Sequence, residues 1–248
     1  MLTSLRYSTL VNLRSTDALA TPSTAAVSLL LAPLLNAGLV TAISFSVNAP
    51  ELRISAQAAV VASIVATTIA QVASQAAMDR MRKVVADVSP YGLLRMGLWS
   101  GKAVVGLISG LATAVFLVLV LTLTGHGDST LVIAALAAPF VCLPGAIAAA
   151  MLSLPRKDPF AFATIATWII PVTSGTVVSI QQYPNALGFI AHALPGTWTI
   201  QGLRHEIPLH SAFVLELVVG ITWLLGGGLT LGRAERRYRS GATDVLPM

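Results

Sequence analysis

The chain has 248 residues, of which 55% are hydrophobic and 10% charged, and its formal net charge is +5. Soluble domains carry about 25% charged residues, so this composition excludes a soluble globular protein. The basic residues border apolar segments instead of clustering on a polar domain, which argues against nucleic acid as a partner. The single Cys142 excludes an intramolecular disulfide and a cysteine metal cluster.

The N-terminal region combines an amphipathic segment with a first apolar run. Residues 1–21 mix leucines with arginines and polar residues, which predicts a short helix lying at the membrane interface; a disordered arm is the alternative. The next run, Thr24–Ser46, has 23 uncharged residues. A signal peptide has an apolar region of about 7–15 residues, so this run predicts a retained first span.

Further apolar stretches follow along the chain. A helix needs about 20 apolar residues to cross a hydrocarbon core of about 30 Å. The stretches that meet this length are Ile54–Met78, Ala103–Thr124, Ser129–Leu154, the longer Pro159–Leu203, and Ile207–Gly232, which only Glu216 interrupts.

The stretch Pro159–Leu203 decides the topology, because its 45 residues contain no Asp, Glu, Lys or Arg. One helix of that length would measure about 68 Å, which is twice what a membrane needs. If the chain crosses once, from Phe160 to about Gln182, thirteen of the fifteen Lys and Arg residues lie in the cytoplasm and only Arg53 and Arg204 lie outside. Residues 186–203 then re-enter the membrane from outside without crossing it.

These elements predict an all-α integral membrane protein with six transmembrane helices, forming one domain over residues 1–248 with both termini in the cytoplasm. Arg outnumbers Lys twelve to three, which with the Ala- and Gly-rich spans is typical of a GC-rich bacterial genome. We therefore expect a multi-pass protein of a bacterial inner (plasma) membrane.

Sequence motifs for catalysis are absent. The chain has no Gly-x-Ser-x-Gly, no His-Glu-x-x-His and no phosphate-binding Gly-x-x-x-x-Gly-Lys, so we expect no catalytic residue and no nucleotide site in it. His205, Glu206 and His210 have the side chains of metal ligands but lack one-turn spacing, so we expect no metal site. Gly226-Gly-Gly228 lies inside the last span, where small residues serve close helix packing.

Four notable polar residues lie within the predicted spans. Glu216 is the one carboxylate among them; it either faces a partner or a cavity and marks function, or sits near the interface in hydrated or protonated form. Asn36, Gln71 and Gln75 either bond neighbouring helices or contact a substrate.

The segment between Asp79 and Lys102 is the most informative loop. Its first half can form a short amphipathic helix with valines on one side and charges on another, ended by Ser89-Pro90 because the residue before proline disfavours helix. Such a charged helix across the ends of two spans suits docking into a cleft on a soluble partner. The alternative is a plain basic loop that only fixes topology.

With these motifs the chain resembles the membrane subunits of ABC transporters of the type-2 permease family, bacterial exporters with six spans and a separate ATPase. The matching elements are Asp79-Arg80, Ser89-Pro90 and Gly101-Lys102, and the match departs at Lys83-Val84. Leu194-Pro195 followed by Arg204 is similar to the family's broken outer re-entrant hairpin, and residues 2–14 are similar to its elbow helix.

The resemblance implies a permease subunit of an ATP-driven exporter of apolar or amphipathic compounds such as drugs or antibiotics. It implies two copies of an ATP-binding subunit that hold ATP and Mg, a second permease copy or a sister permease, and surrounding membrane lipid, with no cofactor in this chain. A coupling helix at 79–90 would use Asp79, Arg80, Arg82, Lys83, Asp87, Ser89 and Pro90, and the substrate path would use Asn36, Gln71, Gln75 and Glu216.

Two rival functions remain open at this stage. One is a membrane-embedded enzyme such as an intramembrane hydrolase, which would need a catalytic constellation inside the spans. The other is a passive immunity or assembly protein of the membrane that transports nothing.

The charge asymmetry yields a test of topology. A cysteine placed at Ser240 is expected to react with an impermeant thiol reagent from the cytoplasmic side, and one at Ser129 from the outside, because the positive-inside rule keeps the Arg-rich tail within. Reaction of the Ser240 variant in intact cells would contradict the six-span topology.

Overall fold

The computed structural model describes residues 21–49, 51–85, 92–94 and 96–239. The expected interfacial helix of residues 1–21 therefore lies, except for Thr21, outside the described residues, as do Asp87, Ser89 and Pro90. All regular elements in the described part are helices, which confirms the all-α class. Five are long and apolar enough to cross a membrane: Pro22–Ser46, Leu52–Met81, Gly97–Leu123, Ser129–Ser153 and Leu209–Arg237.

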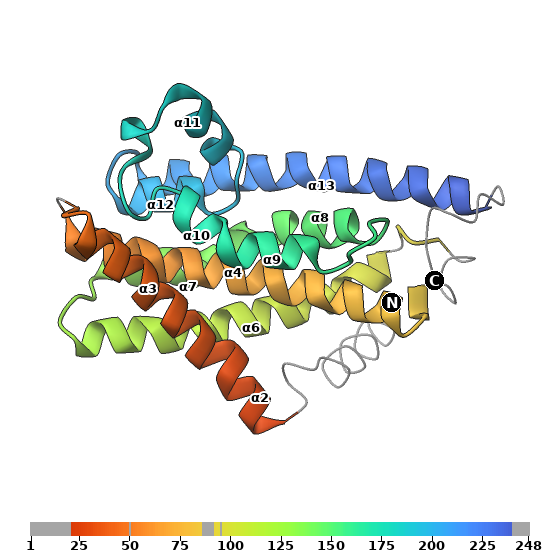
Figure 1. Cartoon of the computed structure of the whole chain (residues 1–248), viewed down its shortest axis with the longest axis horizontal. Helices are drawn as coiled ribbons and strands as arrows, with labels where there is room; N and C mark the ends of the chain where they lie inside the picture. Colours follow the sequence, from red (N-terminus) through yellow and green to blue (C-terminus); the bar gives the residue numbers. More distant parts are fainter. Residues whose placement is uncertain (1–20, 50, 86–91, 95, 240–248) are drawn as a thin grey trace.

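Most of these helices run along the long axis of the molecule (Figure 1). Three are uninterrupted, and the others are divided into shorter elements. The uninterrupted ones are α4 (Leu52–Met81), α6 (Met96–Leu123) and α13 (Leu209–Arg239); the divided ones are α2 (Pro22–Ala26), η2 (Val27–Leu31) and α3 (Ala32–Ser46), then α7 (Ser129–Val141) and α8 (Leu143–Ser153).

Prolines explain both interruptions. Pro33 lacks the N–H that would bond to Leu29 one turn earlier, and the turn before it, η2, is a π-helix. Pro144 stands in the first turn of α8, two residues after Cys142, which caps the end of α7. Proline fits the first turn of a helix but not its interior, so the chain restarts a helix at each of these points.

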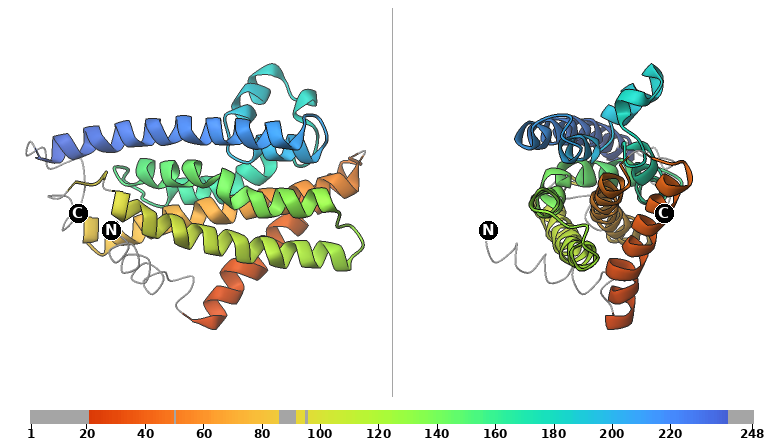
Figure 2. Two further views of the ribbon diagram at one scale, coloured as in Figure 1. Left: turned by 180° about the vertical axis from the view of Figure 1, so that it is seen from behind. Right: turned by 90° about the vertical axis from the view of Figure 1, so that its left-hand side faces the viewer.

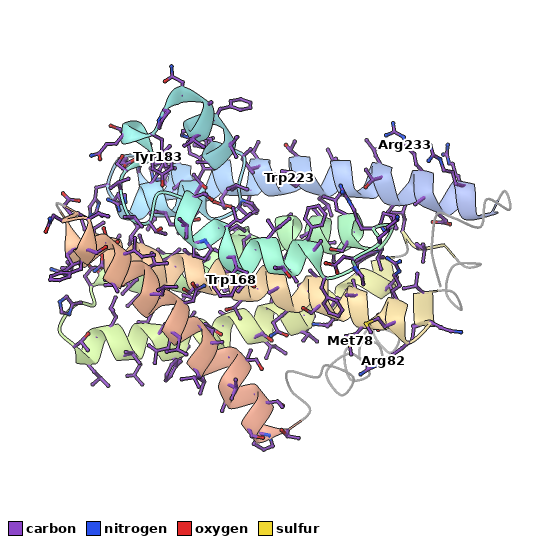
Figure 3. All side chains as sticks on the ribbon, in the orientation of Figure 1. Met78, Arg82, Trp168, Tyr183, Trp223 and Arg233 are labelled. Carbon is purple, nitrogen blue, oxygen red and sulfur yellow. The ribbon has the colours of Figure 1, made fainter. Side chains whose placement is uncertain are left out.

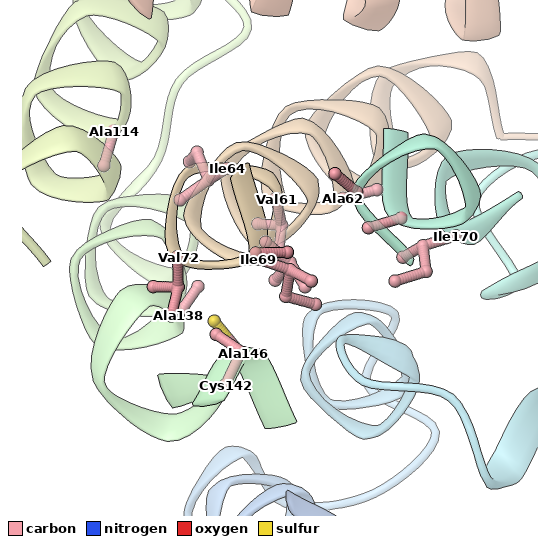
Figure 4. Close-up of a cluster of buried hydrophobic side chains, with 14 of the residues drawn as sticks. Val61, Ala62, Ile64, Ile69, Val72, Ala114, Ala138, Cys142, Ala146 and Ile170 are labelled. Atoms are coloured by element: carbon pink, nitrogen blue, oxygen red, sulfur yellow. The ribbon is translucent and has the colours of Figure 1, made fainter. Parts of the chain in front are cut away.

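Helix α4 lies at the centre of the bundle and packs against α3, α6, α7, α8 and α9. Its buried residues are mainly Ala, Ser and Val, which let neighbouring helices approach it from all sides. Ile64, Ile69 and Val72 fill the remaining spaces (Figure 4). A helix that is apolar all round is a buried one, and α4 has that character.

Glycines set the closest helix contacts. Gly106 and Gly110, one turn apart on α6, face α4 so closely that an added Cβ would lie 2.4 Å from Cγ2 of Val72 and 2.3 Å from Oγ1 of Thr68. This is a Gly-x-x-x-Gly pair, whose missing side chains let two backbones touch. On α13, a Cβ at Gly227 would meet the backbone of α8 at 3.1 Å, as expected for the glycine triplet, whereas Gly226 and Gly228 have open space beside them.

The span expected at Phe160–Gln182 differs from the prediction. Helices α9 (Ala161–Trp168) and α10 (Ile170–Thr173) replace the single long helix, and the chain leaves helical conformation after Thr173. Pro171 cannot bond to the carbonyl of Thr167, and Gly175 follows with a φ of +83°. The apolar helix Ala161–Thr173 is thus shorter than the length that a crossing by itself requires.

The chain then folds into a helical hairpin before α13. It passes through η4 (Ile180–Gln182), α11 (Asn185–His192) and α12 (Thr197–Leu203). Residues 193–196 connect α11 to α12, and Gly196 has a φ of +93°, which favours glycine. Helix α12 packs against α13, α4 and α7, whereas α11 projects from the bundle (Figure 2).

The α4–α6 contact can be tested by adding one methyl group. Gly110→Ala is expected to destabilise the protein by about 1–3 kcal/mol, because its Cβ overlaps Thr68 and Pro139 in a packed interior. Gly38→Ala is the matched control, since a Cβ there meets nothing within 4 Å. Thermal unfolding of the purified variants in detergent measures the difference, and equal melting temperatures would contradict this packing.

Candidate functional site

One end of the bundle collects most of the exposed basic residues in the described part of the chain, and we call it the basic end. Helices α4, α8 and α13 finish there and α6 begins there (Figure 1). Figure 3 shows Arg82 and Arg233 at this end and Tyr183 toward the opposite one. The exposed basic residues at the basic end are Arg82, Lys83, Arg156, Lys157, Arg233, Arg236 and Arg237.

Beneath this surface, Asp79 and Lys102 form an ion pair between the last turn of α4 and the second turn of α6. The Lys102 side chain is only 2% exposed and that of Asp79 is 15% exposed. Burying an ammonium group is costly unless a carboxylate accompanies it, so each residue requires the other. Two separate motif elements of the sequence thus meet in one contact.

Arg80, beside Asp79, joins α4 to a third helix. Its Nη1 donates to the carbonyl of Leu154 at 2.7 Å and also to that of Arg156. These carbonyls follow the end of α8, where the final C=O groups of a helix have no partner within the helix and carry partial negative charge. Asp79-Arg80 therefore holds α6 and α8 together at the end of α4.

The predicted coupling helix is only partly described. Asp79 and Arg80 belong to the last turn of α4, which ends at Met81. Arg82 and Lys83 form a turn in which Lys83 has a φ of +61°, and a new helical turn begins at Val84. A separate helix can therefore begin only after Lys83, and its continuation lies outside the described residues.

The far side of this loop is anchored at Leu93, a contact that sequence reasoning did not anticipate. The Leu93 N–H donates to Oε2 of Glu235 on α13 at 3.1 Å, and its carbonyl accepts from Nε1 of Trp99 on α6 at 2.8 Å. Leu93 itself is fully buried. In the sequence, Glu235 stands alone among arginines near the C-terminus, which indicates that this carboxylate has a specific partner.

The predicted substrate-path residues do not gather at one place. Asn36 on α3 donates through Nδ2 to the Thr167 carbonyl at 3.4 Å, the same carbonyl that Pro171 leaves without its helical partner. Gln71 is half-buried on α4. Gln75, also on α4, is buried, and neither its amide nitrogen nor its oxygen has a hydrogen-bond partner within the described residues.

Glu216 on α13 is 1% exposed, and its carboxylate binds the beginning of α12. It accepts from the backbone N–H of Gly196 at 2.5 Å and of Thr199 at 3.3 Å, with the Thr199 hydroxyl at 3.5 Å. The first N–H groups of a helix are unpaired and carry partial positive charge, so a carboxylate from a neighbouring helix stabilises them. Glu216 thus acts as a cap supplied by another element.

Arg204 secures the other end of α12. Its guanidinium donates to the carbonyls of Gly175 and Thr176, both at 2.8 Å, and to the hydroxyl of Ser55 on α4 at 3.3 Å. Burial lowers the pKa of this guanidinium, which is offset in part by the nearby Glu206 and Glu51 carboxylates. The side chains of Glu216 and Arg204 therefore fix α12 at both ends.

The Asp79–Lys102 pair can be tested with a double-mutant cycle. Asp79→Asn is expected to destabilise the protein by about 3–5 kcal/mol, because it leaves a buried ammonium group without its carboxylate. Adding Lys102→Met should recover most of that loss, since the charge itself is removed. Asp158→Asn, an exposed carboxylate at the same end, is the control. Additive losses in thermal unfolding would contradict the pairing.

The Glu216 cap predicts a local change. Glu216→Gln leaves one acceptor oxygen where two serve now, so the amides of residues 196–199 are expected to exchange deuterium about tenfold faster. Hydrogen–deuterium exchange with mass spectrometry measures this, with Glu51→Gln, an exposed site on the same side, as the control. Unchanged exchange in α12 would show that the cap contributes nothing.

Comparison with known proteins adds no identification. No protein-family model, curated protein or solved structure matches this chain. The resemblance to ABC permeases therefore rests on the short motifs of the sequence, and the site is described from its own geometry.

Proposed function

We propose that this chain is the transmembrane permease subunit of an ATP-driven exporter. A separate ATPase, present in two copies, binds ATP and Mg and performs the hydrolysis, and a second permease copy or a sister permease completes the translocation path. The chain itself supplies helices that switch between two arrangements when the ATPase closes.

The observation that supports this proposal best is the convergence at the basic end. Asp79, Arg80 and Lys102 lie in motifs that the resemblance assigns to coupling, and they join α4, α6 and α8 at the point where the loop after Met81 leaves the bundle. A force on that loop would reach three helices at once. Allosteric coupling needs such a contiguous connection between a docking surface and the moving elements.

The proposal includes a six-crossing topology with both termini in the cytoplasm of a bacterial inner membrane. Its sixth crossing would consist of α9, α10 and the non-helical chain that follows, leading from the basic end toward α12. Non-helical backbone at membrane depth is tolerated where protein buries it. Ser174 and Thr176 are fully buried, and Arg204 binds the carbonyls of Gly175 and Thr176.

The substrate path is proposed to be largely apolar, which suits an apolar or amphipathic compound such as a drug or antibiotic. Gln75 is the residue of the predicted set best suited to substrate contact, because both of its buried polar atoms lack partners within the described residues. Asn36 and Glu216 have structural partners, and Gln71 is half-buried; their contact with substrate stays a prediction.

Charge reversal at the loop tests the docking role without disturbing the core. Arg82→Glu with Lys83→Glu changes two exposed residues directly after α4, and Arg233→Glu with Arg236→Glu makes the same charge change on α13. The tagged chain is purified from its native membranes, and the vanadate-sensitive ATPase activity that accompanies it is measured. The first variant is expected to lose activity at least fivefold, because like charges repel across a docked surface.

Two outcomes would contradict the proposed function. One is that no ATPase accompanies the unmodified chain; the other is that both double variants lose the same activity. Identical elution of all three proteins in size-exclusion chromatography establishes that the fold is intact. Transport of a fluorescent amphipathic dye into inverted vesicles is expected to fall in the Arg82→Glu/Lys83→Glu variant and to stay unchanged in the Arg233→Glu/Arg236→Glu variant.

A further inference from the structure

An apolar groove lies between α3, α4 and α6, toward the end of the bundle opposite the basic end. Helix α3 crosses α4 and α6 obliquely, and the space enclosed has a volume of about 690 Å³ (Figures 1 and 2). That volume is within the range of ligand sites, which is about 300–1,000 Å³. Leu34 and Phe45 on α3, Val60 on α4 and Leu121 on α6 are among its walls.

The length of the groove matches one leaflet of a bilayer. Its lining on α3 extends from Leu34 to Phe45, which corresponds to about 16 Å of helix. A hydrocarbon core is about 30 Å thick, so one leaflet contributes about half of it. An apolar groove of this length, near the end of a bundle of membrane-spanning helices, can hold one acyl chain.

The groove lies beside apolar surface that the bundle leaves exposed. Leu35 and Leu39, on the same helix as the lining residues, are 63% and 52% exposed, and Phe45 is 70% exposed. Gly38 belongs to the lining, and a Cβ added there would meet nothing within 4 Å. The missing side chain leaves room beside α3 that no other part of the described chain occupies.

A guanidinium, ion-paired with a carboxylate, lies at the mouth of the groove. Arg53 and His126 line it, and the Arg53 side chain is 54% exposed. Arg53 donates from Nη2 to Asp128 at 3.2 Å, which leaves Nε and Nη1 without a partner in the described part of the chain. Nη2 carries a second N–H, which with the N–H of Nε or of Nη1 forms an edge that can bind a phosphate through two parallel hydrogen bonds.

Asp128 keeps Arg53 in place without competing for these donors. Its carboxylate accepts from the Leu131 N–H at 2.8 Å, from Nε2 of Gln57 at 2.9 Å and from Arg53. Burial by itself raises the pKa of Asp128, but these hydrogen bonds and the Arg53 charge outweigh it and hold the pKa below its usual value. The carboxylate is therefore ionised and fully engaged, and it orients the guanidinium at the mouth.

We propose that this groove holds one acyl chain of an anionic phospholipid, with the lipid phosphate bound by Arg53. The apolar walls match the acyl chain of such a lipid, and the guanidinium at the mouth matches its phosphate. The site requires only that the chain is embedded in a membrane. It does not depend on the proposed transport function, and the test below uses neither ATPase nor export activity.

The position of the acyl chain in the groove is tested by photolabelling. The full-length protein is reconstituted in vesicles that contain phosphatidylglycerol with a diazirine in the middle of one acyl chain, and labelled peptides are identified by mass spectrometry. Labelling is expected to concentrate on the lining of α3, α4 and α6. Gly38→Phe fills the groove and should reduce that labelling at least fivefold, whereas Gly228→Phe, which also enters open space, should not.

Selection of the anionic head group by Arg53 is tested with the same diazirine probe carried on phosphatidylcholine. A single Arg near a membrane surface favours anionic lipid by about 1 kcal/mol, so the unmodified protein should prefer phosphatidylglycerol about fivefold. Arg53→Lys is expected to keep this preference because it keeps the charge, and Arg53→Gln to abolish it.

Three results would overturn the proposal. The first is labelling spread evenly over the exposed faces of α3 and α13. The second is groove labelling that Gly38→Phe leaves unchanged in a protein of normal melting temperature. The third is equal labelling by the two lipids in the unmodified protein, which would show that Arg53 does not select the head group.

Discussion

Five helices of this bundle are arranged around one helix, α4, that has no exposed face for most of its length. Its Ala, Ser and Val side chains allow α3, α6, α7, α8 and α9 to pack against it, and Gly106 and Gly110 bring α6 closest. Side-chain bonds then fix both of its ends. Gln57 holds Asp128 at one end, and Asp79 and Arg80 hold α6 and α8 at the other. The central helix therefore sets the relative positions of the helices that surround it.

The second organising constraint is that polar groups removed from water must find partners within the chain. Pro171 frees the Thr167 carbonyl, and Asn36 of α3 binds it. The break at Gly196 exposes the first N–H groups of α12, and Glu216 of α13 accepts from them. In both cases a polar residue that looked functional in the sequence compensates an irregularity of the backbone elsewhere. Gln75 lacks such a partner in the described chain, which separates it from the others.

Apolar length and charge predicted the long helices well, because crossing a membrane imposes a minimum run of uncharged residues. Ile54–Met78 and Ser129–Leu154 agree with α4 and the α7–α8 pair to within a few residues. The crossing expected at Phe160–Gln182 is not one continuous helix, because Pro171 and Gly175 end the helix early although the stretch stays apolar; the crossing itself stays a prediction. The partners of distant residues, such as Asp79 for Lys102 or Leu93 for Glu235, cannot be predicted from the sequence, because they depend on how the helices align and not on the local pattern. The Gly-x-x-x-Gly pair on α6 is a local pattern, and it does predict close packing of that helix.

The Glu216 cap has a consequence for the order in which the chain is assembled. Ribosomes deliver residues 196–199 before Glu216, so the first turn of α12 is synthesised before its acceptor exists. Until α13 is inserted, those N–H groups have no carboxylate to accept from them, and a seven-residue helix is too short to be stable by itself. The hairpin can therefore reach its final conformation only when the last helix arrives. Folding of the hairpin waits for the C-terminal helix. A chain that stops before α13 lacks that span and also the cap that stabilises α12.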